Sequence, residues 1–193
     1  METNRFETFF DAIIAIIITV LVLKIPQPAS PTLNAFLELQ TMYVAYLISF
    51  LILYNLWYAN HNLFRLVETI DNTTLWIYGI MTFVISLIPY FTIWLANNVD
   101  SIAAETMFGV IFLVTHFLNT LATRAVYKSN PYNKNLQEIN HNSYYLNLPT
   151  VLIIIGFILT YTVYRPGIYI TCLASIILWI VIDRIIRRDN NGN

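Results

Sequence analysis

Long apolar stretches alternate with short polar connections along the whole chain. Six stretches of about 20 residues can be marked, which is the length that crosses a bilayer as a helix. They are Phe9–Ile25, Met42–Leu63, Leu75–Leu95, Ile102–Ala122, Tyr144–Tyr164 and Ile168–Ile186. The period-2 alternation that a membrane β-barrel requires does not occur in the sequence. The pattern therefore predicts an all-α integral membrane protein with six transmembrane helices.

Composition supports this prediction and excludes several classes of protein. Of the 193 residues, 58% are hydrophobic and only 11% are charged, whereas soluble domains carry about 25% charged residues. A net charge of −1 gives no reason to expect nucleic acid as a partner. The single Cys172 rules out an intrachain disulfide and a cysteine metal cluster. We expect residues 1–193 to form a single six-helix transmembrane domain without an internal repeat.

The first apolar stretch has one alternative interpretation, as a cleaved signal peptide. The sequence PQPAS that follows it offers small residues for cleavage. However, a signal peptide begins with positive charge, and the leading segment METNRFETFFD has three acidic residues against one arginine. We therefore expect this stretch to remain as a helix of the mature protein.

The distribution of lysine and arginine predicts the orientation. With six spans, both termini lie on one side, and eight basic residues lie with them: Arg5, Arg65, Arg124, Lys128, Lys134, Arg184, Arg187 and Arg188. Only Lys24 and Arg165 lie on the other side. Connections rich in lysine and arginine stay in the cytoplasm, so both termini are expected there.

Signals of catalysis are weak. The chain contains no GxSxG, HExxH, P-loop or GxGxxG pattern. Its histidines are His61, His116 and His141, and no two of them have the helical spacing of a metal pair. We therefore expect neither an enzyme nor a bound metal or cofactor. For His116, inside the fourth stretch, a hydrogen bond between helices is the ordinary interpretation, and a proton relay is the alternative.

A glycine-built potassium filter is also missing. Such a filter uses a re-entrant loop of backbone carbonyls, but the five glycines are isolated, at Gly79, Gly109, Gly156, Gly167 and Gly192. If ions cross this protein, side chains must line their path.

The first apolar stretch carries a candidate stripe and a candidate acid. Ile16, Thr19, Val20 and Leu23 have the spacing of one helical face, although packing or lipid contact is the ordinary explanation for such a stripe. Asp11 stands at the start of the apolar run, about 140° around the helix from Ile16. An acid there either benefits from the helix dipole or has a functional partner.

Further polar residues gather at the same predicted membrane face. Trp57 and His61 are four residues apart and share a helical face. Either Asp71 or Asn72 can cap the third helix, and Pro89 should kink it. The inner polar cluster is expected to contain Arg5, Asp11, Trp57, His61 and Asn72.

These residues resemble a known family. The segment Arg5-x-x-x-Phe9-Phe10-Asp11, followed by Thr19, resembles the RxxxFSD signature on the first helix of the transmembrane protein 175 family of cation channels. Trp57, His61, Asn72 and Pro89 are similar to the accompanying pattern of that family. One position departs from it, because Phe10 stands where the family has serine.

The resemblance implies a specific architecture. It implies one six-helix unit of the prokaryotic type, assembled as a homotetramer in the cell membrane, with the first helix around an axial pore. It further implies that Ile16, Val20 and Leu23 form a hydrophobic constriction and that Thr19 influences the preference for potassium. Potassium and other monovalent cations, the lipid bilayer and further copies of the chain are then the expected partners.

Two other classes stay open on the residues alone. A proton-coupled secondary transporter would use Asp11, His61 and His116 as its relay, although such transporters usually show repeats and interrupted helices. A small membrane enzyme is disfavoured by the missing catalytic patterns.

Overall fold

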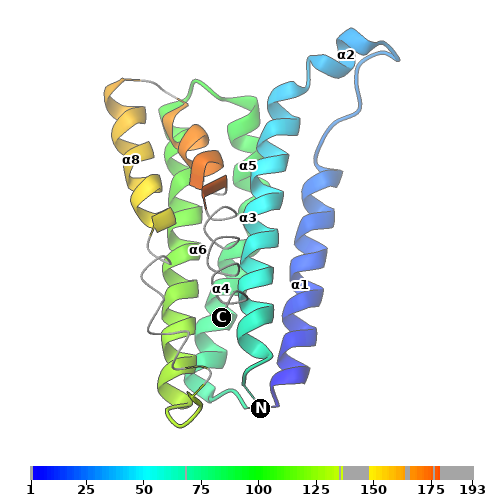
Figure 1. The fold of residues 1–193 in the computed structure, drawn as a ribbon. Coiled ribbons are helices and arrows are strands. Elements are labelled where there is room, and N and C mark those ends of the chain that lie inside the picture. Colours follow the sequence, from blue (N-terminus) through cyan, green and yellow to red (C-terminus); the bar gives the residue numbers. More distant parts are fainter. Residues whose placement is uncertain are drawn as a thin grey trace, which may run out of the picture.

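The computed structural model describes residues 2–67, 69–134, 136, 148–163, 166–175 and 177–178. Long helices lie side by side, and the N-terminus lies at one end of the bundle (Figure 1). The helices are α1 (Thr3–Leu23), α2 (Leu33–Leu37), α3 (Gln40–Phe64), α4 (Asn72–Ser86), α5 (Ile88–Asn97), α6 (Ile102–Ser129) and α8 (Leu148–Thr162). Residues 167–175 and 177–178 are also helical.

The described residues contain four spans that are long and apolar enough to cross a membrane: α1, α3, the α4–α5 pair and α6. The helix α8 is apolar but shorter. A helical architecture with four candidate membrane spans is therefore confirmed for the described residues, while six spans with both termini in the cytoplasm stay a prediction. Parts of the fifth and sixth predicted stretches, at 144–147, 164, 176 and 179–186, lie outside the described residues.

The helices extend beyond the apolar stretches that predicted them. Helix α1 begins at Thr3 rather than Phe9, and α6 continues to Ser129 rather than ending near Ala122. Hydropathy marks only the part of a helix that lies within the membrane. The backbone hydrogen bonds of the helix continue through the polar turns on either side of that part. The additional turns place the polar side chains of α1 on a regular helix.

The predicted kink at Pro89 appears as a break between α4 and α5. Leu87 separates the two helices, and Pro89 occupies the first turn of α5. Proline has no N–H to donate and clashes with the preceding turn, so the local hydrogen bonds tighten: Leu87 donates to the Val84 carbonyl at 3.1 Å, and Tyr90 donates to the Leu87 carbonyl at 3.1 Å.

Asp71 is the N-cap of α4, which decides between the two predicted candidates. Its carboxylate accepts hydrogen bonds from the backbone N–H of Thr73 at 3.2 Å and of Thr74 at 3.3 Å, and from the Thr74 hydroxyl. The Thr74 hydroxyl is the main reason why the pKa of Asp71 is lowered. Asn72 is then the first residue of the helix.

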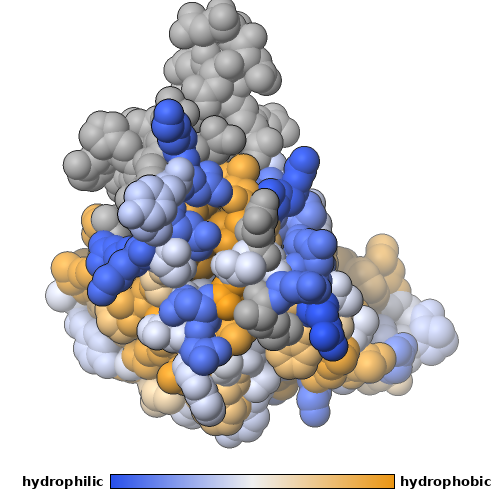
Figure 2. Space-filling view, turned by 90° about the horizontal axis from the view of Figure 1, so that it is seen from below, coloured by the Kyte–Doolittle hydropathy of each residue, from blue (hydrophilic) through white to orange (hydrophobic). Residues whose placement is uncertain are grey.

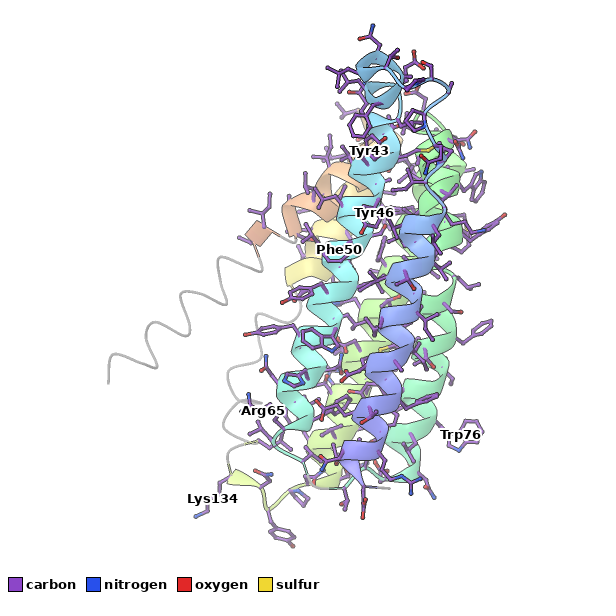
Figure 3. All side chains as sticks on the ribbon, turned by 90° about the vertical axis from the view of Figure 1, so that its right-hand side faces the viewer. Tyr43, Tyr46, Phe50, Arg65, Trp76 and Lys134 are labelled. Carbon is purple, nitrogen blue, oxygen red and sulfur yellow. The ribbon has the colours of Figure 1, made fainter. Side chains whose placement is uncertain are left out.

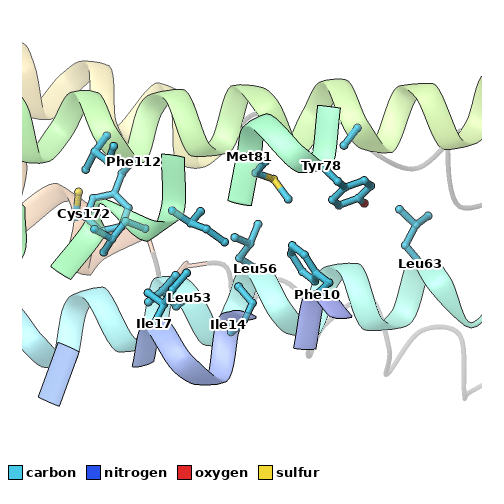
Figure 4. Close-up of a cluster of buried hydrophobic side chains, with 14 of the residues drawn as sticks. Phe10, Ile14, Ile17, Leu53, Leu56, Leu63, Tyr78, Met81, Phe112 and Cys172 are labelled. Carbon is cyan, nitrogen blue, oxygen red and sulfur yellow. The ribbon is translucent and has the colours of Figure 1, made fainter. Parts of the chain in front are cut away.

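The buried core lies where α1, α3, α4, α5 and α6 meet (Figure 4). Its fully buried members include Leu53 of α3, Met81 of α4 and Ile88 of α5. Helix α1 contacts α3, α4 and α5, and α8 packs against α6. Consequently α1 lies at the margin of the described bundle, with one side packed and one side open.

Basic residues are exposed around the end of the bundle that holds the N-terminus. They are Arg5, Arg65, Arg124, Lys128 and Lys134. Seen from this end, hydrophilic residues surround and partly cover the apolar interior (Figure 2). This arrangement agrees with the side on which the sequence places most of its basic residues.

Candidate ion path and inner polar cluster

Helix α1 has two distinct faces. Its buried face consists of residues three or four positions apart: Phe6, Phe10, Ile14, Ile17 and Leu21. The opposite face carries the predicted stripe, with Ile16 60%, Val20 37% and Leu23 80% exposed. Figure 3 looks onto this side of the bundle, where α1 lies in front. The described part of the chain therefore leaves the whole candidate stripe uncovered.

Thr19 is exposed on the same face as Ile16 and Val20. Its hydroxyl donates to the Ile16 carbonyl oxygen at 2.8 Å. This bond uses the one proton of the hydroxyl, whereas the oxygen has two lone pairs. Thr19 thus presents an acceptor oxygen between apolar side chains.

Asp11 and Trp57, two residues of the expected inner polar cluster, lie in direct contact. The indole Nε1 of Trp57 donates to Asp11 Oδ1 at 2.9 Å. A carboxylate that accepts a hydrogen bond in a partly buried place is stabilised relative to an unpaired one. This bond therefore holds α1 against α3.

A second contact lies one helical turn away. Nδ1 of His61 is 2.6 Å from Oε1 of Glu7, and the rings of His61 and Trp57 stack with centroids 5.3 Å apart. Glu7 precedes Asp11 by four residues and His61 follows Trp57 by four, so two antiparallel helices place the pairs on successive turns. This matched spacing is the signal in the sequence that identifies Glu7 as the partner of His61.

The other two predicted members of the cluster lie apart from these pairs. Arg5 is exposed near the start of α1, and Asn72 is exposed as the first residue of α4. The hydrogen bonds described for Asp11 and His61 go to Trp57 and Glu7 instead. The described contacts thus unite Asp11, Trp57 and His61, and do not include Arg5 or Asn72.

Phe10 explains how the chain tolerates its departure from the family motif. It is fully buried, and its ring lies edge-on to Phe64 at 6.1 Å and to Tyr78 at 5.6 Å between centroids. Phe6 stacks on the same ring at 6.3 Å. Aromatic pairs at these separations are favourable. Where the family has a serine hydroxyl, this chain joins α1 to α3 and α4 through aromatic packing.

A buried polar network lies beside this aromatic cluster. The hydroxyl of Tyr78 donates to Asn60 Oδ1 at 2.5 Å, and the Asn60 amide donates to Asn119 Oδ1 at 2.8 Å. The network links α4, α3 and α6. The sequence does not identify Asn60 as a member of this network, because spacing within one helix does not show which residues of another helix it faces.

Among the residues that the structure describes, no group of three or more His, Cys, Asp or Glu side chains that could hold a metal occurs. His116 lines a groove between α6 and α8. His141 lies outside the described residues.

Comparisons with known proteins agree with the motif and the helix arrangement. The family model described as endosomal/lysosomal potassium channel TMEM175 matches residues 5–89, which contain the candidate stripe and both contacts between α1 and α3. A curated potassium channel from Chryseobacterium sp. is 23% identical over 193 residues, covering 100% of both chains. Another, from Chamaesiphon minutus, is 29% identical over 130 residues, which cover 62% of this chain and 64% of that one.

A solved structure shares the fold. The crystal structure of a lysosomal potassium-selective channel TMEM175 homolog from Chamaesiphon minutus matches with a TM-score of 0.77. The match covers 92% of this chain and 96% of that one at 22% sequence identity. Together with the family model that matches residues 5–89 and the relatives named as potassium channels, this match shows that the chain is similar to the TMEM175 family of potassium channels and shares the fold of a homolog.

Proposed function

We propose that the protein is a homotetrameric, potassium-permeable cation channel of the cell membrane, in which four copies of α1 surround the ion path. Ile16, Val20 and Leu23 form its hydrophobic constriction. The observation that carries this proposal is the uncovered apolar face of α1, on which all three side chains are exposed. The match of residues 5–89 to the TMEM175 family model and the similarity to a relative named as a potassium channel support transport of potassium rather than catalysis.

Geometry explains why several copies are needed. One helix cannot enclose a path, so identical faces must meet around a symmetry axis. From Ile16 to Leu23 the helix rises about 10 Å, so the three rings form a short apolar section. Such a section can close a path by excluding water, and it conducts when it becomes wetted.

The composition of the face supports an ion path over simple lipid contact. Besides the apolar residues, it carries Arg5, Thr8, Ala12 and Thr19, all exposed. A helix surface that faces only lipid has no use for charge and hydroxyl groups. Polar and small residues next to apolar rings agree better with a path that is partly filled with water.

Thr19 is proposed to supply oxygen ligands near the constriction. Four copies would place four hydroxyl oxygens at one level of the axis, each with lone pairs beyond its bond to the Ile16 carbonyl. A partly dehydrated potassium ion requires oxygen ligands in place of water. Thr19 is therefore proposed to influence the preference for potassium over sodium.

The test replaces Ile16 with asparagine and measures potassium flux into liposomes. A polar ring favours wetting, so Ile16→Asn should increase the flux above wild type. Ile80 of α4 provides a matched control, because it is also an isoleucine and is 54% exposed, compared with 60% for Ile16. Ile80→Asn should not increase the flux. Equal flux from wild type and a well-folded Ile16→Asn protein would contradict the proposal.

A further inference from the structure

A groove lies between α6 and the beginning of α8, away from the candidate ion path. Its volume is about 420 Å³, within the range of about 300–1,000 Å³ typical of sites for small ligands. The two helices pack directly against each other (Figure 1). The wall residues Phe117 of α6 and Ile154 of α8 are both exposed, so the groove opens to the outside of the bundle.

The wall contributed by α6 changes from apolar to basic along its length. Leu113, Phe117 and Leu121 follow one another at four-residue intervals, and Arg124 lies less than one turn beyond them. These positions share one helical face. The helix rises about 16 Å between Leu113 and Arg124, which is close to the depth of one leaflet, half of a hydrocarbon core about 30 Å thick.

The basic end of the groove has no anionic partner within the described chain. Arg124 is exposed, and none of the carboxylates that the structure describes lies within 4.0 Å of its guanidinium. Lys128 is exposed one turn farther along α6, which adds a second positive charge on the same side. Arginine near the end of a membrane helix extends its guanidinium toward the headgroup region.

From this amphipathic shape we propose that the groove binds an anionic phospholipid. One acyl chain lies along Leu113, Phe117 and Ile154, and the phosphate lies at Arg124, with Lys128 nearby. A guanidinium pairs well with phosphate oxygens, and basic pockets between membrane helices are suited to anionic headgroups. A zwitterionic lipid has no net charge to neutralise Arg124. The proposal requires a membrane environment but does not depend on the path of the ions.

The experiment measures lipid retention on the full-length protein by native mass spectrometry in detergent. The protein is titrated with phosphatidylglycerol or with phosphatidylcholine of identical acyl chains. Wild type should retain phosphatidylglycerol preferentially. Arg124→Gln should weaken that retention about fivefold, the effect expected for one basic residue at an anionic surface. Lys134→Gln is the matched control, because Lys134 is also exposed and basic but does not line the groove.

A second variant tests the acyl-chain part of the site. Ile154→Trp fills the groove while leaving Arg124 in place, and it should also abolish preferential retention. Helical content and elution volume should match wild type for each variant, because both positions are exposed. Equal retention by wild type and Arg124→Gln, or an equal loss from Lys134→Gln, would overturn the proposal. Retention unchanged by Ile154→Trp would also overturn it, because charge alone would then explain the binding.

Discussion

The orientation of α1 about its own axis can be tested with two neighbouring phenylalanines. Phe10 is fully buried, whereas Phe9 is 57% exposed on the face that carries the stripe. Replacing Phe10 with alanine removes its ring contacts with Phe6, Phe64 and Tyr78. Aromatic pairs contribute about 0.5–1.5 kcal/mol each, and buried Phe→Ala substitutions cost about 3–5 kcal/mol. We expect Phe10→Ala to lower the free energy of unfolding by about 3 kcal/mol.

The assay is unfolding in mixed detergent micelles, followed by circular dichroism at one fixed protein concentration, because assembly makes stability depend on concentration. Phe9→Ala is the control and should change the free energy of unfolding by less than about 1 kcal/mol, as is usual for exposed positions. If Phe9→Ala destabilises the protein as much as Phe10→Ala or more, α1 is rotated differently. The stripe of Ile16, Val20 and Leu23 would then not be the open face.

Three further predictions concern individual contacts. In a double-mutant cycle, Asp11→Ala and Trp57→Phe should show a coupling of about 1.5–3 kcal/mol in the free energy of unfolding, the range for hydrogen bonds to charged groups; additive effects would show that their bond does not contribute. Asp71→Ala should cost about 1 kcal/mol at neutral pH by removing the cap of α4. Because hydrogen bonds lower the pKa of Asp71 in the folded state, its contribution is complete above its unfolded pKa of about 3.9 and decreases as pH falls through the folded pKa. Unfolding midpoints of wild type and Asp71→Ala should therefore converge in acid, and a constant difference would contradict this. Thr19→Val should lower the preference for potassium over sodium in liposome currents while current persists; an unchanged preference would remove Thr19 from the selectivity proposal.

Helix positions and the break at Pro89 follow from the sequence, because they depend on local physics. Apolar length predicts the spans, and the missing N–H of proline predicts the interruption between α4 and α5. The helix ends are harder to predict from the sequence. The polar first turns of α1, from Thr3, and the polar last turns of α6, up to Ser129, give no hydropathy signal. The short helix α2 has only five residues, which is too few for a helical hydropathy pattern to indicate it.

Contacts between helices are harder to predict, because they depend on the register of one helix against another. The shared face of Trp57 and His61 is visible in the sequence, but the partner Glu7 appears only when α1 and α3 are aligned. The burial of Phe10 and the bond between Tyr78 and Asn60 likewise involve residues far apart in the chain. The sequence therefore indicates that polar residues gather near this end of α1, but it does not show which of them are in contact.

The central claim is that four copies of α1 surround the ion path with their open faces. A single-particle image of the protein in a lipid nanodisc tests it most directly, because it shows the number of subunits and the helix nearest the axis. We expect four subunits, with Ile16, Val20 and Leu23 of each copy directed toward the axis. A monomer or dimer, or an assembly in which this face of α1 contacts lipid, would contradict it.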